Sequence, residues 1–428
     1  MTADKRRGGH EPAPDDAARP ARLGPESPPP GPEPQDGLLG RSLAIIFVAR
    51  TALNTSHRII YPFLPSIARG LGISLTTASF LVTSRLVVGL AAPFLGPMAE
   101  RHSRRRVMEI ALLLFVVASF LLADSNGFLL AIVAFVLFGL SKVVYDPAVH
   151  AYLGDTVPYA RRGRAVGIVE LSWSSAWLLG VPASGFLIER LGWRAPWAML
   201  CLLGLLGLGL THVGLPRGRR ARQDGRPLRM VDLLRSWRKL LHQRQVAVLL
   251  LTSLLLVMAL EIPFIVYGAW LESSFGLSLS TLGLASIVVG LAEASGEFGT
   301  TLFTDRLGKK RSVLLGLLGL AASLILLPGL ARLGLAPALG GVVLVMLSFE
   351  FGFVSLIPMA SEMVPDARST LLSLNVTAFS LGRIAGAAVG GWLWQWPVEG
   401  IGAHAAVGAA CALIAALLVG RGLAEIEG

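Results

Sequence analysis

The sequence predicts an all-α polytopic membrane protein, with twelve transmembrane helices in two pseudo-symmetric six-helix bundles. Three observations lead to this fold class. The 428-residue chain is 54% hydrophobic and only 15% charged, whereas soluble proteins average about 25% charged residues. Apolar runs close to the ~20 residues that cross a bilayer recur along the chain. A short basic motif also occurs twice, once in each half of the sequence.

The chain begins with a proline-rich segment, residues 1–40, that carries charges of both signs and has no apolar run. Such a segment buries too little apolar surface to offset the entropy of ordering, so we expect a disordered tail. Residues 41–214 are predicted to form one bundle and residues 246–422 the other, followed by a short tail, residues 423–428. The twelve spans are expected at residues 42–64, 76–95, 107–123, 128–150, 165–188, 196–213, 246–271, 281–303, 313–330, 339–361, 371–394 and 402–418.

The segment between the bundles, residues 215–245, is predicted to end in an amphipathic helix on the cytoplasmic leaflet, because leucines and a tryptophan share one helical face and cations the other. The basic loops all fall on one side of the predicted spans. The positive-inside rule therefore places both termini in the cytoplasm, and the net charge of +11 reports orientation rather than nucleic-acid binding. An aromatic belt at the outer interface is expected from Trp193, Trp197, Trp392, Trp394 and Trp396.

The repeated motif is a basic turn between two apolar runs. It reads GPMAERHSRRR at residues 96–106 and TLFTDRLGKKR at residues 301–311. In both copies an acidic residue and an arginine precede three cations, which predicts a duplicated unit. The cations alone need only fix membrane orientation, but the preceding acid requires a further role. The candidate gate residues of these loops are Gly96, Glu100, Arg101, Arg105, Asp305, Arg306 and Gly308.

These two loops resemble the signature loop of the major facilitator superfamily of secondary transporters, which lies between the second and third helices of each half. The family pattern is Gly, three residues, Asp, Arg, one residue, Gly and then basic residues. The copies depart from it at Glu100, Ser103 and Thr301. The resemblance implies alternating access between two bundles, with Glu100 and Asp305 helping to hold the cytoplasmic side shut.

Glycines recur in the predicted fifth and eleventh spans, where Pro182, Gly185, Gly386 and Gly390 are further candidates for a conformational gate. Small residues at four-residue steps let helix backbones approach closely. Two interpretations stay open: these residues serve tight packing alone, or they let the two helices slide as the halves move.

The chemistry is expected in ionisable residues inside the predicted spans, because a charge at the bilayer centre costs at least ~2.5–3.5 kcal/mol and normally faces the bundle interior. Lys142 and Asp146 share one helical face. We interpret Asp146 as a proton carrier or a latch with Lys142 as its partner; an intrahelical salt bridge without transport function is the alternative. The candidates for substrate binding or coupling are Arg50, Asn54, Arg58, Arg85, Lys142, Asp146, Glu170, Glu261, Glu293, Glu350 and Arg383.

These features predict a secondary active transporter that moves a small organic solute by alternating access, with proton-coupled efflux as the leading hypothesis. A symporter that takes up an organic anion through Arg50, Arg85 and Lys142 is the alternative, as is a transporter-like sensor or scaffold. No phosphate-binding loop, metal-ligand set or nucleophile–base pair is evident, so neither an enzyme nor a cofactor is expected. The predicted setting is a monomer, multi-pass in the plasma membrane, whose partners are a small-molecule substrate, protons and the lipid bilayer.

Overall fold

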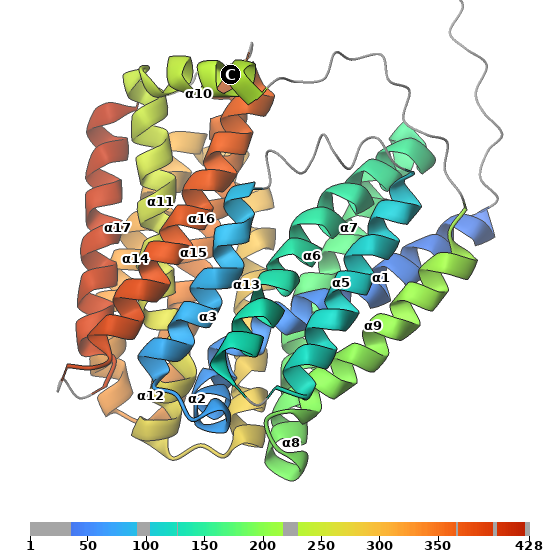
Figure 1. Ribbon diagram of the computed structural model, residues 1–428. Coiled ribbons are helices and arrows are strands. Elements are labelled where there is room, and N and C mark those ends of the chain that lie inside the picture. The colour runs from blue at the N-terminus through green and yellow to red at the C-terminus, as the bar shows by residue number, and fades with distance from the viewer. Residues whose placement is uncertain are drawn as a thin grey trace, which may run out of the picture.

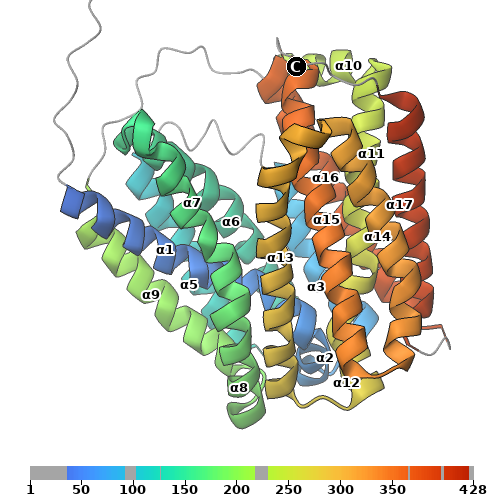
Figure 2. The ribbon, with the colours of Figure 1, turned by 180° about the vertical axis from the view of Figure 1, so that it is seen from behind.

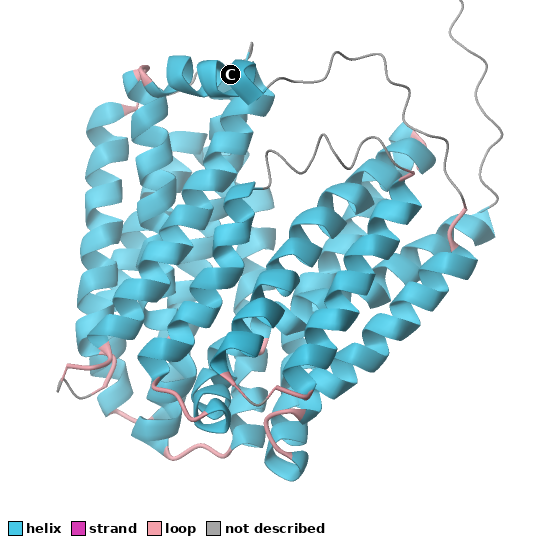
Figure 3. Cartoon of the chain, viewed as in Figure 1, coloured by secondary structure: helices cyan, strands magenta, loops and turns pink. Residues whose placement is uncertain are grey.

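The computed structural model describes residues 36–91, 103–125, 127–216, 230–364, 367–396 and 400–423. Within these ranges the chain consists of helices joined by short loops, and the described residues include no strand (Figure 3). The all-α membrane fold is therefore confirmed. Gly96, Glu100 and Arg101 lie outside the described residues, and so does the side chain of Asp305.

The elements follow the predicted spans closely. The first half comprises α1 (Asp36–Arg58), α2 (Ile60–Leu71), α3 (Leu75–Val87), η1 (Val88–Ala91), α5 (Arg104–Ala123), α6 (Phe128–Thr156), α7 (Tyr159–Ser175), η2 (Ala176–Gly180), α8 (Val181–Leu191) and α9 (Ala195–Gly214). The second half comprises α11 (Arg244–Phe264), α12 (Tyr267–Phe275), α13 (Leu279–Leu307), α14 (Lys309–Arg332), α15 (Leu335–Met363), α16 (Arg368–Leu393) and α17 (Gly402–Gly422). Between the halves lies α10 (Met230–Leu241), and α1 begins within the segment predicted as a tail.

Ten of the described helices are long and apolar enough to cross a membrane, and an eleventh span results if the bent pair Ile60–Leu71 and Leu75–Leu90, which meet at 117°, is one span. The predicted number of twelve is thus confirmed only in part. The first helix, α1, has 23 residues but a low mean hydropathy. Its polar residues, Arg50, Asn54 and Arg58 among them, are the ones that the sequence singles out for function.

The two halves pack against each other through two corresponding pairs of helices. The second span of each half packs on the fifth span of the other: α3 contacts α16, and α8 contacts α13. A further contact joins α2 and α12. Figures 1 and 2 show that the halves meet at the end where α12 lies, the α12 end, and diverge toward the end where α10 lies, the α10 end.

The first span of each half is broken at a corresponding place. A one-residue break at Ile59 separates α1 from α2, and residues 265–266 separate α11 from α12. Pro62 and Pro263 lie next to these breaks and supply no backbone N–H, which removes one helical hydrogen bond at each place. Each break lies close to a charged residue of its span, Arg58 in the first half and Glu261 in the second.

One part of the predicted aromatic belt is wrong. Trp197 is fully buried, and its ring lies 5.5 Å from the ring of Phe138 and 6.3 Å from that of Phe135. Three large rings from α6 and α9 bury more apolar surface together than they would at the interface. Trp392 and Trp396 are about half exposed, as a belt requires.

Candidate functional site

A cavity of about 300 Å³ lies between the two halves. Its lining comes from α1, α2 and α7 of the first half and from α11, α13, α15 and α16 of the second. Six of the predicted site residues line it: Arg58, Glu170, Glu261, Glu293, Glu350 and Arg383. The structure therefore brings together residues from both halves that are far apart in the sequence.

The predicted residues Arg50, Lys142 and Asp146 form an ion-pair cluster with Glu170. Arg50 Nε lies 3.1 Å from Asp146 Oδ1, and Arg50 Nη1 lies 3.0 Å from Glu170 Oε2. Lys142 Nζ lies 2.8 Å from Asp146 Oδ2. Both cations are buried, whereas the side chain of Asp146 is 24% exposed and that of Glu170 39% exposed. Two positive and two negative charges balance, which makes the burial of both cations tolerable.

Asn54 links this cluster to α7. It accepts a hydrogen bond from Lys142 and donates one of 2.9 Å to Ser172 Oγ. Trp173, the next residue, places its ring 4.1 Å from Lys142 Nζ, within cation–π range. Sequence reasoning missed Ser172 and Trp173, although a tryptophan pair four residues apart, with Trp177, follows Glu170 and was a visible signal.

A second set of contacts crosses between the halves at Glu293 of α13. Arg58 pairs with this carboxylate, and Trp177 Nε1 donates a 2.8 Å hydrogen bond to it. The guanidinium of Arg58 also lies 4.7 Å from the ring of Trp173. Trp177 belongs to η2, a short π-helix, a feature that occurs often at functional sites. The first half thus holds Glu293 by charge and by hydrogen bonding.

Glu261 of α11 makes a third contact between the halves. The hydroxyl of Tyr61 donates to it at 3.1 Å, and the residue is 3% exposed. Arg85 and Arg383, one from each half, interact with it electrostatically. Arg85 is buried, and it donates a long hydrogen bond of 3.5 Å to the His57 carbonyl.

Glu350 differs from these acids. It is 7% exposed and lines the cavity, yet in the described part of the chain no cation lies within 4 Å of it. Its charged neighbours include two acids, Glu293 and Glu297. Among the described residues Glu261 also has no cation within 4 Å, but it accepts a hydrogen bond from Tyr61, whereas Glu350 has neither a cation nor a donor.

At the α12 end, polar contacts join the halves. Arg69 Nη2 lies 2.9 Å from Glu272 Oε1, and Glu189 Oε2 accepts a 2.7 Å hydrogen bond from the Ser280 amide at the start of α13. At the start of α3, Thr76 Oγ1 donates to the Gly391 carbonyl at 2.8 Å. A second repeated motif, GISLTT at residues 72–77 and GLSLST at residues 276–281, builds these two helix starts. Sequence reasoning missed this repeat.

The predicted gate residues of the fifth and eleventh spans lie at close helix crossings. A Cβ added at Gly185 would overlap the Leu279 carbonyl, and one at Gly390 would overlap the Ile262 carbonyl. Gly386 lies against the Glu261 side chain, and Pro182 packs against Gly283. These contacts explain why glycine occurs there, and the gating role stays a prediction.

The basic loops make matching contacts in the two halves. Arg104 Nε lies 3.2 Å from Asp155 Oδ2, and Lys309 pairs with Glu362 in the corresponding place. Arg105 donates to the Leu215 carbonyl at 2.9 Å, and Lys310 donates to the Leu423 carbonyl at 2.6 Å. Both carbonyls cap the last helix of their half, where a cation is favourable.

The second loop also explains one position of the motif. Gly308 adopts a φ of +85°, a conformation that glycine reaches at little cost. In the first copy Ser103 has a φ of −64°, so its side chain is compatible with the backbone. Arg306 has an exposed side chain.

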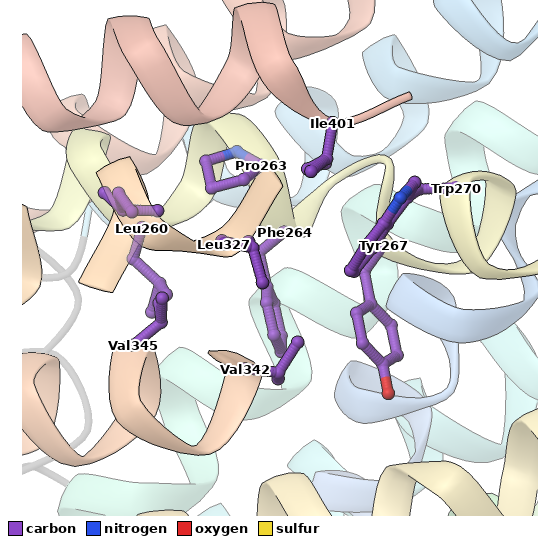
Figure 4. A pocket seen from close by; sticks show the side chains of 10 residues that line it. Leu260, Pro263, Phe264, Tyr267, Trp270, Leu327, Val342, Val345 and Ile401 are labelled. Carbon is purple, nitrogen blue, oxygen red and sulfur yellow. The ribbon is translucent and has the colours of Figure 1, made fainter. Parts of the chain in front are cut away.

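A second, much smaller pocket lies inside the second half (Figure 4). Its volume is about 20 Å³, and apolar and aromatic side chains surround it, including Leu260, Phe264 and Tyr267. A space of this size holds roughly one water molecule. It is therefore too small for an organic solute.

The structure has two helical halves related by duplication, and helices of both halves surround a charged cavity. This arrangement defines a membrane transport protein. The family described as Major Facilitator Superfamily matches residues 45–269 and 249–427. The chain belongs to this family, and it is a transporter rather than an enzyme.

Relatives and solved structures agree with this assignment. The chain is 25% identical to the uncharacterized MFS-type transporter YceJ of Bacillus subtilis (strain 168), over 82% of this chain and 88% of the relative. It is 23% identical to multidrug resistance protein 2 of the same organism, over 82% and 88%. The crystal structure of a D-xylose–proton symporter superposes with a TM-score of 0.73 at 18% identity, covering 91% of this chain and 98% of that one.

Proposed function

We propose that the protein is a proton-coupled exporter of a small organic solute. The observation that carries this proposal is the charge of the cavity. Among its lining residues five acids face two cations, and when Arg50, Arg85, Lys142 and Asp146 are added the acids still outnumber the cations by six to five. An uncompensated buried acid favours a bound proton or a cationic ligand, and it disfavours an organic anion.

Within this proposal the acids have different roles. Two cations compensate the charge of Asp146, whereas Glu350 has no such partner in the described residues. We assign the proton-binding step to Glu350 and the role of a latch between α1, α6 and α7 to Asp146. Arg58, Glu293 and Trp177 close the path toward the α12 end by joining the two halves.

The setting of the transporter follows from the same arrangement. We place the α10 end in the cytoplasm, as the positive-inside rule requires for its basic helix ends, and the α12 end outside the plasma membrane. The conformation described is then open toward the cytoplasm. The cavity is complete within one chain, which supports a monomer in the bilayer as the working unit.

The relatives support export without deciding it. Multidrug resistance protein 2 bears a name that indicates export of drugs, while the D-xylose–proton symporter indicates proton coupling in the opposite mode. Uptake of an organic anion remains the second candidate, because Arg85 and Arg383 both act on the single carboxylate of Glu261. The sensor hypothesis has no contact in the described residues that favours it.

Transport in proteoliposomes tests the proposal. The full chain would be reconstituted with a pH-sensitive dye inside, and methyltriphenylphosphonium, xylose and benzoate would be offered as a cation, a neutral solute and an anion. We expect a proton gradient to accelerate counter-directed movement of one solute at least tenfold, with protons moving the opposite way. Movement of benzoate together with protons would establish the symporter, and transport that ignores the gradient would rule out proton coupling.

A further inference from the structure

The carboxylate of Glu350 is the most unusual polar group of the cavity. The residue lies in the middle of α15 and lines the cavity. Only 7% of its surface is exposed. In the part of the chain that the structure describes, it has no hydrogen-bond donor and no cation within 4 Å. A buried, ionised carboxylate without a partner is costly, and a cationic ligand would remove that cost.

Two neighbouring acids already have partners, and a third adds to the negative charge around Glu350. Glu293 is held by Arg58 and Trp177, and Glu261 accepts from Tyr61. Glu297, one turn after Glu293 on α13, is exposed and adds negative charge next to Glu350. Arg58 and Arg383 also act on Glu350 electrostatically, but among the described residues neither lies within ion-pair distance of its carboxylate.

Helix packing fixes the base of the Glu350 side chain. Gly296 of α13 lies against the Cβ of Glu350, and a Cβ added to this glycine would approach the Glu350 Cβ to 2.7 Å. Gly296 thus allows α13 and α15 to come close at this level. The Cβ of Glu350 is therefore held at the helix crossing, and the residue lines the cavity.

Aromatic rings lie beside the acid on the same helix and on α16. Phe349 and Phe353 stack at 5.4 Å between ring centres, and Phe353 lies 4.7 Å from Phe379. Phe349 and Phe353 both line the cavity, together with Met346. Aromatic faces attract cations, and the attraction grows in a desolvated site.

We propose that Glu350, with Phe349 and Phe353, forms a subsite for the charged group of an amphiphilic organic cation. The carboxylate supplies the counter-charge and the rings accept the apolar part of the ligand. The cavity volume of about 300 Å³ is at the lower end of small-molecule sites. An inorganic divalent cation fits poorly, because such an ion needs several oxygen ligands and no metal-binding group of side chains occurs among the described residues.

This inference rests on the proposed function only in treating the cavity as the substrate site, and equilibrium binding tests it without transport. Methyltriphenylphosphonium is a permanent cation, and triphenylphosphine oxide is a neutral compound of nearly the same shape. Binding of each to the purified full chain in detergent would be measured by equilibrium dialysis. We expect the cation to bind at least tenfold more tightly than the neutral compound.

Variants then locate the subsite. Glu350→Gln should weaken binding of the cation at least tenfold and leave the neutral compound unchanged, whereas Glu350→Asp, which keeps the charge, should remain within about threefold of the wild type. Phe353→Leu should weaken the cation by about threefold to tenfold. Glu362→Gln, a substitution at the α10 end outside the cavity, is the matched control and should bind normally.

Unchanged cation binding in Glu350→Gln would overturn the inference, and so would equal binding of the cation and the neutral compound by the wild type. Loss of Glu350-dependent binding is a separate result from loss of gradient-driven transport. A protein that binds the cation through Glu350 but ignores the proton gradient would refute the proposed function and keep the subsite. A protein that couples transport to protons but binds the cation independently of Glu350 would refute the subsite and keep the proposed function.

Discussion

At the scale of single residues, the cluster around Asp146 shows how a membrane interior accommodates charge. Arg50 comes from α1, Lys142 and Asp146 from α6, and Glu170 from α7, so three helices share the cost of burying four charges. Each carboxylate is partly exposed, and each cation is buried. The balance of the cluster, rather than any one pair, keeps it inside the protein.

A double-mutant cycle tests this balance. Lys142→Met leaves Asp146 with one cation, and Asp146→Asn leaves Lys142 with no acid at that contact. Each substitution should lower the free energy of unfolding by roughly 1–3 kcal/mol. The loss should be smaller than for a fully buried pair because Asp146 is partly exposed. The double variant should lose less than the sum, with a coupling of about 0.5–3 kcal/mol. Unfolding in SDS would be the measurement.

The surface pair Arg104→Gln and Asp155→Asn is the control for this cycle. Asp155 is more than half exposed, so the coupling between these two residues should be roughly 0–1 kcal/mol. Additive losses for Lys142 and Asp146 would show that the contact between them does not stabilise the fold.

Residue spacing predicted part of this site. Four-residue steps placed Lys142 and Asp146 on one face, and the structure confirms that they meet. The pairing of Arg58 with Glu293 could not be derived, because it depends on how two halves pack and no local pattern encodes that packing. That no cation among the described residues pairs with Glu350 is likewise a property of the folded cavity alone.

At the scale of elements, duplication is the most informative feature of the sequence. It predicted corresponding basic loops, and the structure shows that Arg105 and Lys310 cap corresponding helix ends at Leu215 and Leu423. The breaks between α1 and α2 and between α11 and α12 were not predicted, because apolar runs continue through them. Pro263 marks one of these breaks in the sequence.

The contact between α2 and α12 leads to a prediction about Gly268. This glycine packs so closely on Pro62 that an added Cβ would overlap the Pro62 carbonyl. Gly268→Val should therefore force the halves apart at the α12 end. Hydrogen exchange of the full chain should become at least tenfold faster in α2 and α12.

Gly329→Val, at a helical position with open space around it, is the matched control and should leave this exchange unchanged. Unchanged exchange in Gly268→Val would show that this contact does not hold the α12 end together.

At the scale of the whole molecule, two pairs of helices, each with one member from either half, hold the halves together along their sides. The contacts of α3 with α16 and of α8 with α13 run along helices, and the α12 end adds single polar contacts and the close packing of α2 on α12. Lateral packing of this kind allows the halves to rock without separating when the contacts at the α12 end part. Opening at the α12 end requires that Arg69 and Glu272 part.

Cross-linking tests this movement and the orientation together. Arg69→Cys and Glu272→Cys would be introduced into a chain with Cys201→Ser and Cys411→Ser, and a short, cleavable, membrane-impermeant thiol cross-linker would be added outside intact cells. Because the two side chains are in contact, we expect efficient cross-linking and a loss of transport of at least tenfold, restored by cleavage. Binding of methyltriphenylphosphonium should persist, since the opposite end stays open.

The pair Arg104→Cys and Asp155→Cys, within one half, is the control and should leave transport intact after linkage in inverted vesicles. Full transport by the linked first pair would refute the rocking of the halves at this end, and linkage of that pair from the cytoplasmic side alone would reverse the proposed orientation.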